Sequence, residues 1–330
     1  MKKVRSALGE HSVGCRKEGW SLSKRLKLIY NPEAGAGAFK RSLDEAIAIL
    51  QSGQWQVLTY RTEGIPGETS KEAEKALQDG CSAVVAVGGD GTLHQVMNGL
   101  MRLADRGETP PALGIIPAGT ANDLATTLRI PRNVEACCRI IVEGHTREID
   151  VGQIGDRHFL NVASGGLMTD VSHKVNQSLK NNIGKLAYYL KALEQLPEFR
   201  PFSLTIETTS GETVYSGETL LYLILNGTGA GSFPVLSPHA CLDDGILDLL
   251  VFRSCRIHDF ISLFVRVLQG EHLNSPLVTY HQASAYIIRG PESLETDMDG
   301  EVGPPLPWKV QVRPSALSLF VPKVSAHSST

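Results

Sequence analysis

A regular alternation of strand-like and helix-like segments over the first 150 residues is the feature that most constrains the fold. Four short apolar runs are typical of strands: Leu26–Tyr30, Trp55–Tyr60, Ala83–Val87 and Leu113–Ile116. Five segments with apolar residues at helical spacing accompany them: Phe39–Leu50, Ser70–Leu77, Leu93–Leu103, Asp123–Leu128 and Val134–Val142. This alternation predicts a parallel sheet with helices on both faces.

The pattern changes to strands with few helices beyond about residue 150. Eight segments resemble strands: Ile149–Ile154, His158–Ala163, Phe202–Thr208, Thr213–Glu218, Leu220–Leu225, Ile246–Phe252, Tyr280–Ile288 and Lys309–Val312. Two helices are expected among them, Val171–Leu196 and Ile257–Leu268. Mostly antiparallel strands in a sandwich or half-barrel fit this half best. At 330 residues the chain is long enough for about two domains, and the last strand, Ala316–Val321, fits either of them.

A glycine-rich loop follows the buried strand Ala83–Val87: Gly88, Gly89, Asp90, Gly91 and Thr92. Glycines at the end of a parallel strand let backbone N–H groups approach a phosphate closely. The positive end of the following helix points at the same place, and Asp90 could hold a metal ion that bridges phosphates. A plain tight turn capped by Asp90 and Thr92 is the alternative.

A second loop of this kind follows the strand Leu113–Ile116. It contains Gly119, Thr120 and Asn122, and Asn122 is a good N-cap for a helix that begins at Asp123. Because ligands of open α/β sheets lie outside the carboxyl ends of the strands, two such loops favour a nucleotide site over two unrelated turns. Asn31 and Gly35 follow the first strand in a similar arrangement, which is a weak signal by itself.

Taken together, these segments resemble the diacylglycerol-kinase catalytic family, in particular its bacterial YegS-like lipid kinases, with sphingosine kinases as distant relatives. The matching segments occur in the family's order from Lys27 to Val321: Asn31-Pro32 with Gly35, Gly88–Thr92, Gly119–Asp123, Asp150–Gly152, Asn161–Gly166, Leu225–Gly227, Leu242–Asp248 and Asp299–Glu301.

The resemblance implies a two-domain α/β fold with the active site between the domains, as in diacylglycerol and NAD kinases. Residues 26–150, with a returning strand at 313–322, would form an N-terminal α/β nucleotide domain. Residues 151–312 would form a C-terminal antiparallel β-sandwich that carries the lipid side of the cleft. Residues 1–25 would be a flexible basic arm, and residues 323–330 a flexible tail.

The same resemblance assigns the nucleotide and metal ligands. ATP would be bound by Asn31, Thr62, Gly88, Gly89, Asp90, Gly91, Thr92, Gly119, Thr120 and Asn122. The catalytic Mg²⁺ would be held, partly through water, by Asp90, Asp123 and Asp150. A second, structural metal would be held by the Asp244 side chain and the carbonyl groups of Cys241 and Ile246, a spacing that can surround a hard cation. An Asp-Gly turn between two strands is the alternative there.

The family's catalytic base falls on the segment around Asp299-Gly300. We assign it to Asp299, with Glu301 as the second choice, because an acidic group facing the cleft can accept the proton of the acceptor hydroxyl. Asp299-Gly300 is also a good two-residue hairpin tip, so a structural role is the alternative.

One departure from the family lies just after the first glycine loop. Most bacterial relatives have Asn-Glu where this chain has His94-Gln95, and the histidine resembles the sphingosine-kinase pattern. We expect His94 to be a surface or capping residue.

Two other functions remain open. An NAD kinase shares the Gly-Gly-Asp-Gly turn, but it lacks the Gly119–Asp123 loop and carries a Thr-Gly-Ser-Thr-Ala-Tyr-type stretch that is not visible here. A non-catalytic nucleotide- or lipid-binding module is the other alternative. The retention of four acidic residues argues against it: Asp90, Asp123, Asp150 and Asp299.

The composition of the chain limits the classes of partner that it can bind. A net charge of −3 argues against a nucleic-acid partner, and six cysteines without metal spacing fit a reduced, cytoplasmic protein. No apolar run reaches the ~18 residues that span a bilayer. Lysines among apolar residues of Val171–Leu196 allow transient contact with an anionic membrane, although a helix covering the sandwich has the same pattern. A homodimer is compatible with the two-domain fold.

Overall fold

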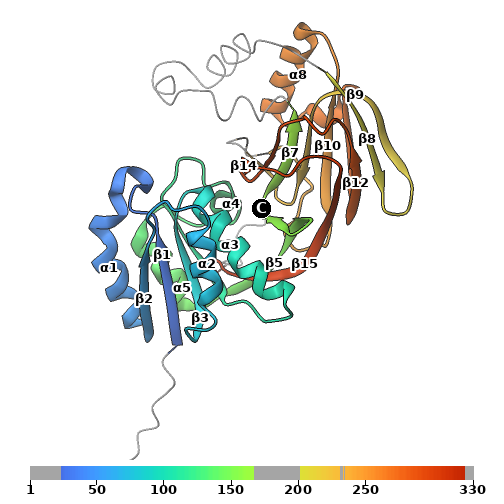
Figure 1. Ribbon diagram of the computed structural model, residues 1–330. Coiled ribbons are helices and arrows are strands. Elements are labelled where there is room, and N and C mark those ends of the chain that lie inside the picture. The colour runs from blue at the N-terminus through green and yellow to red at the C-terminus, as the bar shows by residue number, and fades with distance from the viewer. Residues whose placement is uncertain (1–23, 167–200, 231–232, 234, 324–330) are drawn as a thin grey trace, which may run out of the picture.

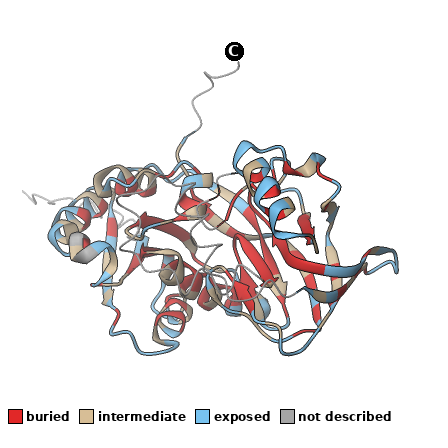
Figure 2. Cartoon of the chain, turned by 90° about the horizontal axis from the view of Figure 1, so that it is seen from above, coloured by how far each residue is buried: buried red, intermediate tan, exposed pale blue. Residues whose placement is uncertain are grey.

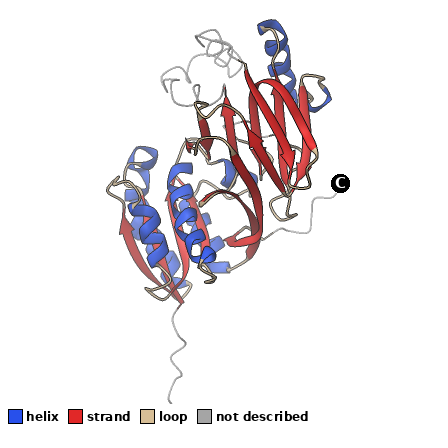
Figure 3. Ribbon diagram, turned by 45° about the vertical axis from the view of Figure 1, so that its right-hand side comes forward, coloured by secondary structure: helices blue, strands red, loops and turns tan. Residues whose placement is uncertain are grey.

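A computed structural model describes residues 24–166, 201–230, 233 and 235–323 of the chain. They form two lobes that lie side by side (Figure 1). One lobe combines helices and strands, whereas the other consists mainly of strands with one long helix at its outer end (Figure 3). The helix expected at Val171–Leu196 lies outside the described residues. Among the residues that are described, no helix is long and apolar enough to cross a membrane.

The N-terminal lobe is a parallel sheet with the strand order β4-β3-β1-β2. Its strands are β1 (Lys24–Tyr30), β2 (Trp55–Arg61), β3 (Cys81–Gly88) and β4 (Ala112–Pro117). Its helices are η1 (Ala34–Gly37), α1 (Ala38–Ser52), α2 (Glu68–Lys75), α3 (Asp90–Asp105), α4 (Asp123–Thr127) and α5 (Val134–Glu143). The predicted parallel α/β domain is confirmed.

The C-terminal lobe is antiparallel in the part of the chain that is described. Its strands are β6 (Arg157–Phe159), β7 (Val162–Gly166), β8 (Phe202–Thr208), β9 (Thr213–Leu225), β10 (Leu247–Arg253), β11 (Val278–Ala283), β12 (Ala285–Arg289), β13 (Thr296–Met298) and β14 (Glu301–Val302). The helices α8 (Ile257–Gln269) and η3 (His272–Asn274) follow β10. The predicted antiparallel sandwich is confirmed.

Two strands join the lobes, β5 (Thr146–Ile154) and β15 (Trp308–Phe320). β15 pairs with β12 of the sandwich and, through Leu319, with Leu113 of β4 in the N-terminal sheet. The last strand therefore rejoins the N-terminal lobe, and one hydrogen-bonded sheet runs through both lobes. This continuity fixes the position of one lobe against the other.

Several predicted strand boundaries are wrong, each for a local reason. The segment His158–Ala163 is interrupted at Leu160 and Asn161, because these backbone N–H groups bond to a carboxylate rather than to a strand. The segment Tyr280–Ile288 divides at Ser284, where the chain passes from pairing with β10 to pairing with β8 and β15. Conversely, the two segments predicted on each side of Ser315 are continuous in β15, with a register shift where Ser315 has φ 48°.

Buried residues form three apolar clusters. One fills the N-terminal lobe, a second fills the sandwich, and a third lies between the sandwich strands and α8. Figure 2 shows the buried residues along the strands of both lobes, while the helices are buried on one side only. The third cluster borders the candidate site.

Candidate functional site

The two glycine loops converge at the ends of neighbouring strands. β3 and β4 pair in parallel up to Gly88 and Pro117, and the Ala118 N–H bonds to the Gly88 carbonyl at 2.8 Å. A Cβ atom on Gly119 would lie only 2.4 Å from the Cα atom of Gly89. The loop after β1 joins them, since a Cβ on Gly35 would lie 2.7 Å from the Ala118 carbonyl oxygen. The predicted convergence is confirmed, and it depends on glycine.

Asp90 ties the two loops together. Its Oδ2 accepts a hydrogen bond from the Asn122 N–H at 2.9 Å, and its Oδ1 accepts one from the Asp123 N–H at 3.0 Å. Asn122 is the N-cap residue of α4, as predicted, but its side chain makes no capping hydrogen bond. Asn122 has φ 54°, and its side chain exchanges two hydrogen bonds with the Gly119 backbone. Asp90 takes the capping role across the loops.

Arg132 supports the second loop, and sequence reasoning missed it. Its guanidinium donates to the carbonyl oxygens of Gly119, Thr120 and Ala121, at 3.3, 2.9 and 3.0 Å. An isolated arginine ten residues beyond a loop carries no motif, so only the folded chain shows this contact. The carbonyl groups of residues 119–121 therefore point toward Arg132.

Asn31 and Thr62 lie at the ends of β1 and β2, beside this group of loops. The Asn31 side chain accepts from the Glu33 N–H at 2.9 Å, and the Thr62 N–H bonds to the Tyr30 carbonyl at 3.0 Å. Thr92 packs over the first loop, because a Cβ on Gly88 would lie 2.4 Å from its hydroxyl oxygen. Their assignment as nucleotide ligands stays a prediction.

The opposite wall of the site comes from the other lobe. Asp299 and Gly300 form the two-residue tip between β13 and β14, with φ values of 53° and 89°, as the hairpin prediction requires. The next residue, Glu301, reaches the first glycine loop: a Cβ on Gly91 would lie 2.9 Å from Glu301 Oε1. The acidic tip of the sandwich therefore faces the glycine loops directly.

Asp299 is held by three consecutive backbone groups. Its Oδ2 accepts from the Leu160 N–H at 2.6 Å, and its Oδ1 accepts from the N–H groups of Asn161 and Val162, both at 2.9 Å. Its Oδ2 also lies 3.2 Å from His94 Nδ1. His94 is 6% exposed, so the prediction of a surface or capping histidine is wrong. Periodicity places His94 on α3 but does not show what packs against that face.

The predicted magnesium ligands are not all brought together. Asp90 and Asp123 line one cavity, which suits a cation held by one or two carboxylates and by phosphates. Asp150 is 1% exposed, and its oxygens accept from the backbone N–H groups of Gly245 and Ser315. The described residues contain no group of three acidic, histidine or cysteine side chains placed to hold a metal. The metal roles stay predictions.

The loop proposed for a second metal is a turn after residue 241. The Ile246 N–H bonds to Asp244 Oδ1 at 3.0 Å, which is the local geometry of an Asx turn. Burial, together with the nearby carboxylates of Asp248 and Asp150, raises the pKa of Asp244. Such crowding of carboxylates would be relieved by a cation, so the side chain fits one, whereas the carbonyl contributions of Cys241 and Ile246 stay predictions.

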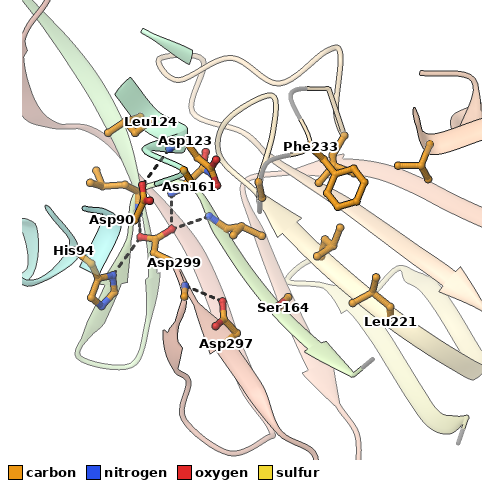
Figure 4. A pocket seen from close by; sticks show the side chains of 18 of the residues that line it. Asp90, His94, Asp123, Leu124, Asn161, Ser164, Leu221, Phe233, Asp297 and Asp299 are labelled. Atoms are coloured by element: carbon orange, nitrogen blue, oxygen red, sulfur yellow. Dashed lines mark hydrogen bonds and ion pairs between the residues drawn. The ribbon is translucent and has the colours of Figure 1, made fainter. Parts of the chain in front are cut away.

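A cavity of about 270 Å³ begins at Asp90, Asp123 and Asp299 and extends into the third apolar cluster. Its polar end is lined by Asp90, His94, Asp123 and Asp299, and its other end by Leu221, Phe233, Phe252, Phe260, Leu263 and Val267. Figure 4 shows Asp90, His94 and Asp299 at one side and Phe233 and Leu221 at the other. Sequence reasoning missed the apolar end, because its residues read as ordinary strand and helix core.

Comparisons with known proteins identify the family of the chain. The sequence profile of the diacylglycerol kinase catalytic domain matches residues 25–154, and that of the YegS C-terminal NAD kinase beta sandwich-like domain matches residues 161–321. A diacylglycerol kinase of Staphylococcus aureus is 35% identical over 301 residues, which covers 91% of this chain and 93% of that protein.

Solved structures give the same result. A crystal structure of a diacylglycerol kinase from Bacillus anthracis has a TM-score of 0.73 and 26% identity, over 91% of this chain and 98% of that one. Another structure from the same organism has a TM-score of 0.75 and 27% identity, over 91% and 96% of the two chains. The similarity therefore extends across both lobes.

Proposed function

The chain belongs to the diacylglycerol kinase catalytic family, and from that premise we propose that it transfers the γ-phosphoryl group of ATP to a hydroxyl group of a lipid. The observation that carries the lipid part is the cavity, which joins the acidic residues to a wall of leucine, valine and phenylalanine side chains. A lipid has the same two ends, a polar head with a hydroxyl group and a hydrocarbon chain.

Phosphoryl transfer mainly requires positioning and charge stabilisation. Backbone N–H groups of the loops around Gly89 and Gly119 would bind the phosphates of ATP. Mg²⁺, held near Asp90 and Asp123, would neutralise charge on those phosphates. Asp299 would receive the proton of the attacking hydroxyl.

Diacylglycerol is our first choice of acceptor, followed by phosphatidylglycerol or a sphingoid base. The apolar wall argues against NAD phosphorylation, because a dinucleotide would leave its polar groups without partners among Phe252, Leu263 and Val267. We also propose that the protein is cytoplasmic and meets its substrate at the membrane surface.

A first prediction concerns the phosphate loops. Gly119→Ala should raise the Kd for ATP about 10-fold, equivalent to about 1.4 kcal/mol, because the new Cβ would lie 2.4 Å from Gly89 Cα and would push the loops apart. Calorimetric titration with ATP measures this change. Gly217→Ala is the matched control, since its Cβ would meet only the Tyr215 side chain, with the hydroxyl oxygen at 3.3 Å and the nearest ring carbon at 3.6 Å. Equal ATP affinity of the two variants would show that these loops do not bind ATP.

A second prediction tests the cavity as a site for hydrocarbon chains. Leu263 is 2% exposed and lines the apolar end, so Leu263→Trp should fill space that a long acyl chain needs. We expect kcat/KM for long-chain diacylglycerol to fall at least ~10-fold, comparable to the loss of one or two well-packed methylene groups. The rate with a short-chain diacylglycerol should change less than about 3-fold.

Leu263→Met is the matched control, because it conserves volume and is tolerated in most cores. Steady-state kinetics with acceptors of increasing chain length give the comparison. If Leu263→Trp lowered the rates for short and long chains equally while its melting temperature was unchanged, acyl chains would not bind in this cavity.

A further inference from the structure

The structure places His94 on the face of α3 that lines the cavity. Its Nδ1 lies 3.2 Å from Asp299 Oδ2, across the boundary between the lobes. Both side chains are 7% exposed, and both line the cavity. Figure 4 shows the His94 ring directed toward the Asp299 carboxylate. The proposed base therefore has a histidine of the other lobe as a direct neighbour.

The acceptor sites of Asp299 are full in this arrangement. A carboxylate has about four lone-pair sites, and four donors meet Asp299: three backbone N–H groups and His94. To take a proton from a substrate, the carboxylate must give up one of these contacts. The three backbone groups belong to consecutive residues in one connection, so they cannot leave separately. His94 is the one side-chain donor among the four.

The Asp299 carboxylate can only accept a hydrogen bond, so the His94 ring carries a proton on Nδ1, facing Asp299. The other side of the ring faces Asn98, whose amide nitrogen lies 3.2 Å from His94 Nε2 and also donates to the His94 carbonyl at 3.0 Å. Asn98 is itself held by the backbone of His158: its Oδ1 accepts from the His158 N–H at 3.0 Å, and its Nδ2 donates to the His158 carbonyl at 3.1 Å. The orientation of His94 is thus set by both lobes.

A third residue of the same α3 face completes this contact between the lobes. Positions 94, 98 and 105 lie on one face of a helix. The Asp105 carboxylate is paired with Arg313 at 2.9 Å and lies 3.6 Å from His158 Nε2. All the partners of this face come from β6, β15 and the tip of the β13–β14 hairpin. His94 therefore sits at the catalytic end of a polar seam, defined as His94, Asn98 and Asp105.

We propose that His94 is a positioning residue for Asp299, which holds Oδ2 in place before the reaction and yields this acceptor site to the substrate hydroxyl. The inference rests on the proposed kinase function. In the step concerned, the hydroxyl O–H bond breaks and its proton passes to Asp299 Oδ2. The alkoxide oxygen forms its bond to the γ-phosphorus atom as the bond to the ADP oxygen breaks.

The kinetic test compares two replacements of His94. His94→Phe keeps a ring but has no donor, so kcat should fall at least ~10-fold, a part of the ~100-fold or more that a positioned general base contributes. The KM values for ATP and lipid should change less than about 3-fold. His94→Asn restores a short side-chain donor and should recover most of kcat. His145→Phe, at an exposed position outside the site, is the control.

A spectroscopic readout separates this inference from the proposed function. The ¹⁵N shifts of labelled histidines should show His94 as the Nδ1–H tautomer in the resting protein, without any substrate present. A His94→Phe variant with wild-type kcat, or a His94 resonance that carries its proton on Nε2, would overturn the positioning role. Absence of transfer to every lipid, with the tautomer as expected, would instead overturn the kinase proposal.

Discussion

Asp90→Asn is expected to lower kcat at least ~100-fold, the scale of a lost electrostatic contribution in the transition state. The carboxylate has two tasks in the structure. It lines the cavity as part of the first glycine loop, and its two oxygens cap the N–H groups of Asn122 and Asp123. An asparagine has only one acceptor oxygen, so one of those N–H groups would lose its partner, which costs about 1–3 kcal/mol.

The measurement therefore needs three readouts: kcat, the Kd for ATP and the melting temperature. We expect a large loss of kcat, a smaller loss of ATP affinity and a lower melting temperature. Asp44→Asn removes a carboxylate from the exposed surface of α1 and should change none of them. A folded Asp90→Asn protein with more than a tenth of wild-type kcat would show that Asp90 is only a helix cap.

Asp299→Asn is expected to lower kcat by a similar factor, at least ~100-fold, because the group that accepts the proton is lost. Asparagine is the informative replacement, since Asp299 has φ 53° and asparagine tolerates this left-handed region. The three backbone N–H groups from Leu160 to Val162 would lose part of their acceptor, so some destabilisation is expected as well.

Glu301→Gln is the matched comparison, because Glu301 follows two residues later and contacts Gly91. Our assignment predicts a much smaller loss of kcat for Glu301→Gln than for Asp299→Asn, with both variants assayed at saturating ATP and lipid. The opposite ranking would show that Glu301 is the base. Small effects in both variants would show that the hairpin tip has no part in catalysis.

Local sequence signals predicted the architecture well. Continuous apolar runs such as Ala83–Val87 and glycines directly after them identified the parallel strands and the ends where the loops meet. The Asp299-Gly300 turn was predictable for the same reason, since two-residue hairpins have strict backbone requirements. The ordered segments resembling a lipid kinase agree with profile matches to both lobes.

Contacts between distant segments could not be predicted in this way. The hydrogen bonds from Asp90 to residues 122 and 123, and from Asp299 to residues 160–162, replace the local caps and strand pairs that sequence rules assume. The burial of His94 has the same origin, because its partner lies 205 residues away. The apolar end of the cavity was equally hidden, since Leu263 and Val267 have the spacing of any amphipathic helix.

Transfer of labelled phosphate from γ-³²P ATP to diacylglycerol in mixed micelles tests the central claim most directly, with NAD and other lipids as parallel acceptors. A kinase in which the glycine loops hold ATP beside a hydrocarbon cavity should label a lipid, in an ATP-dependent reaction that Asp90→Asn and Asp299→Asn both abolish. Labelling of NAD alone, or tight ATP binding without transfer to any acceptor, would contradict the account.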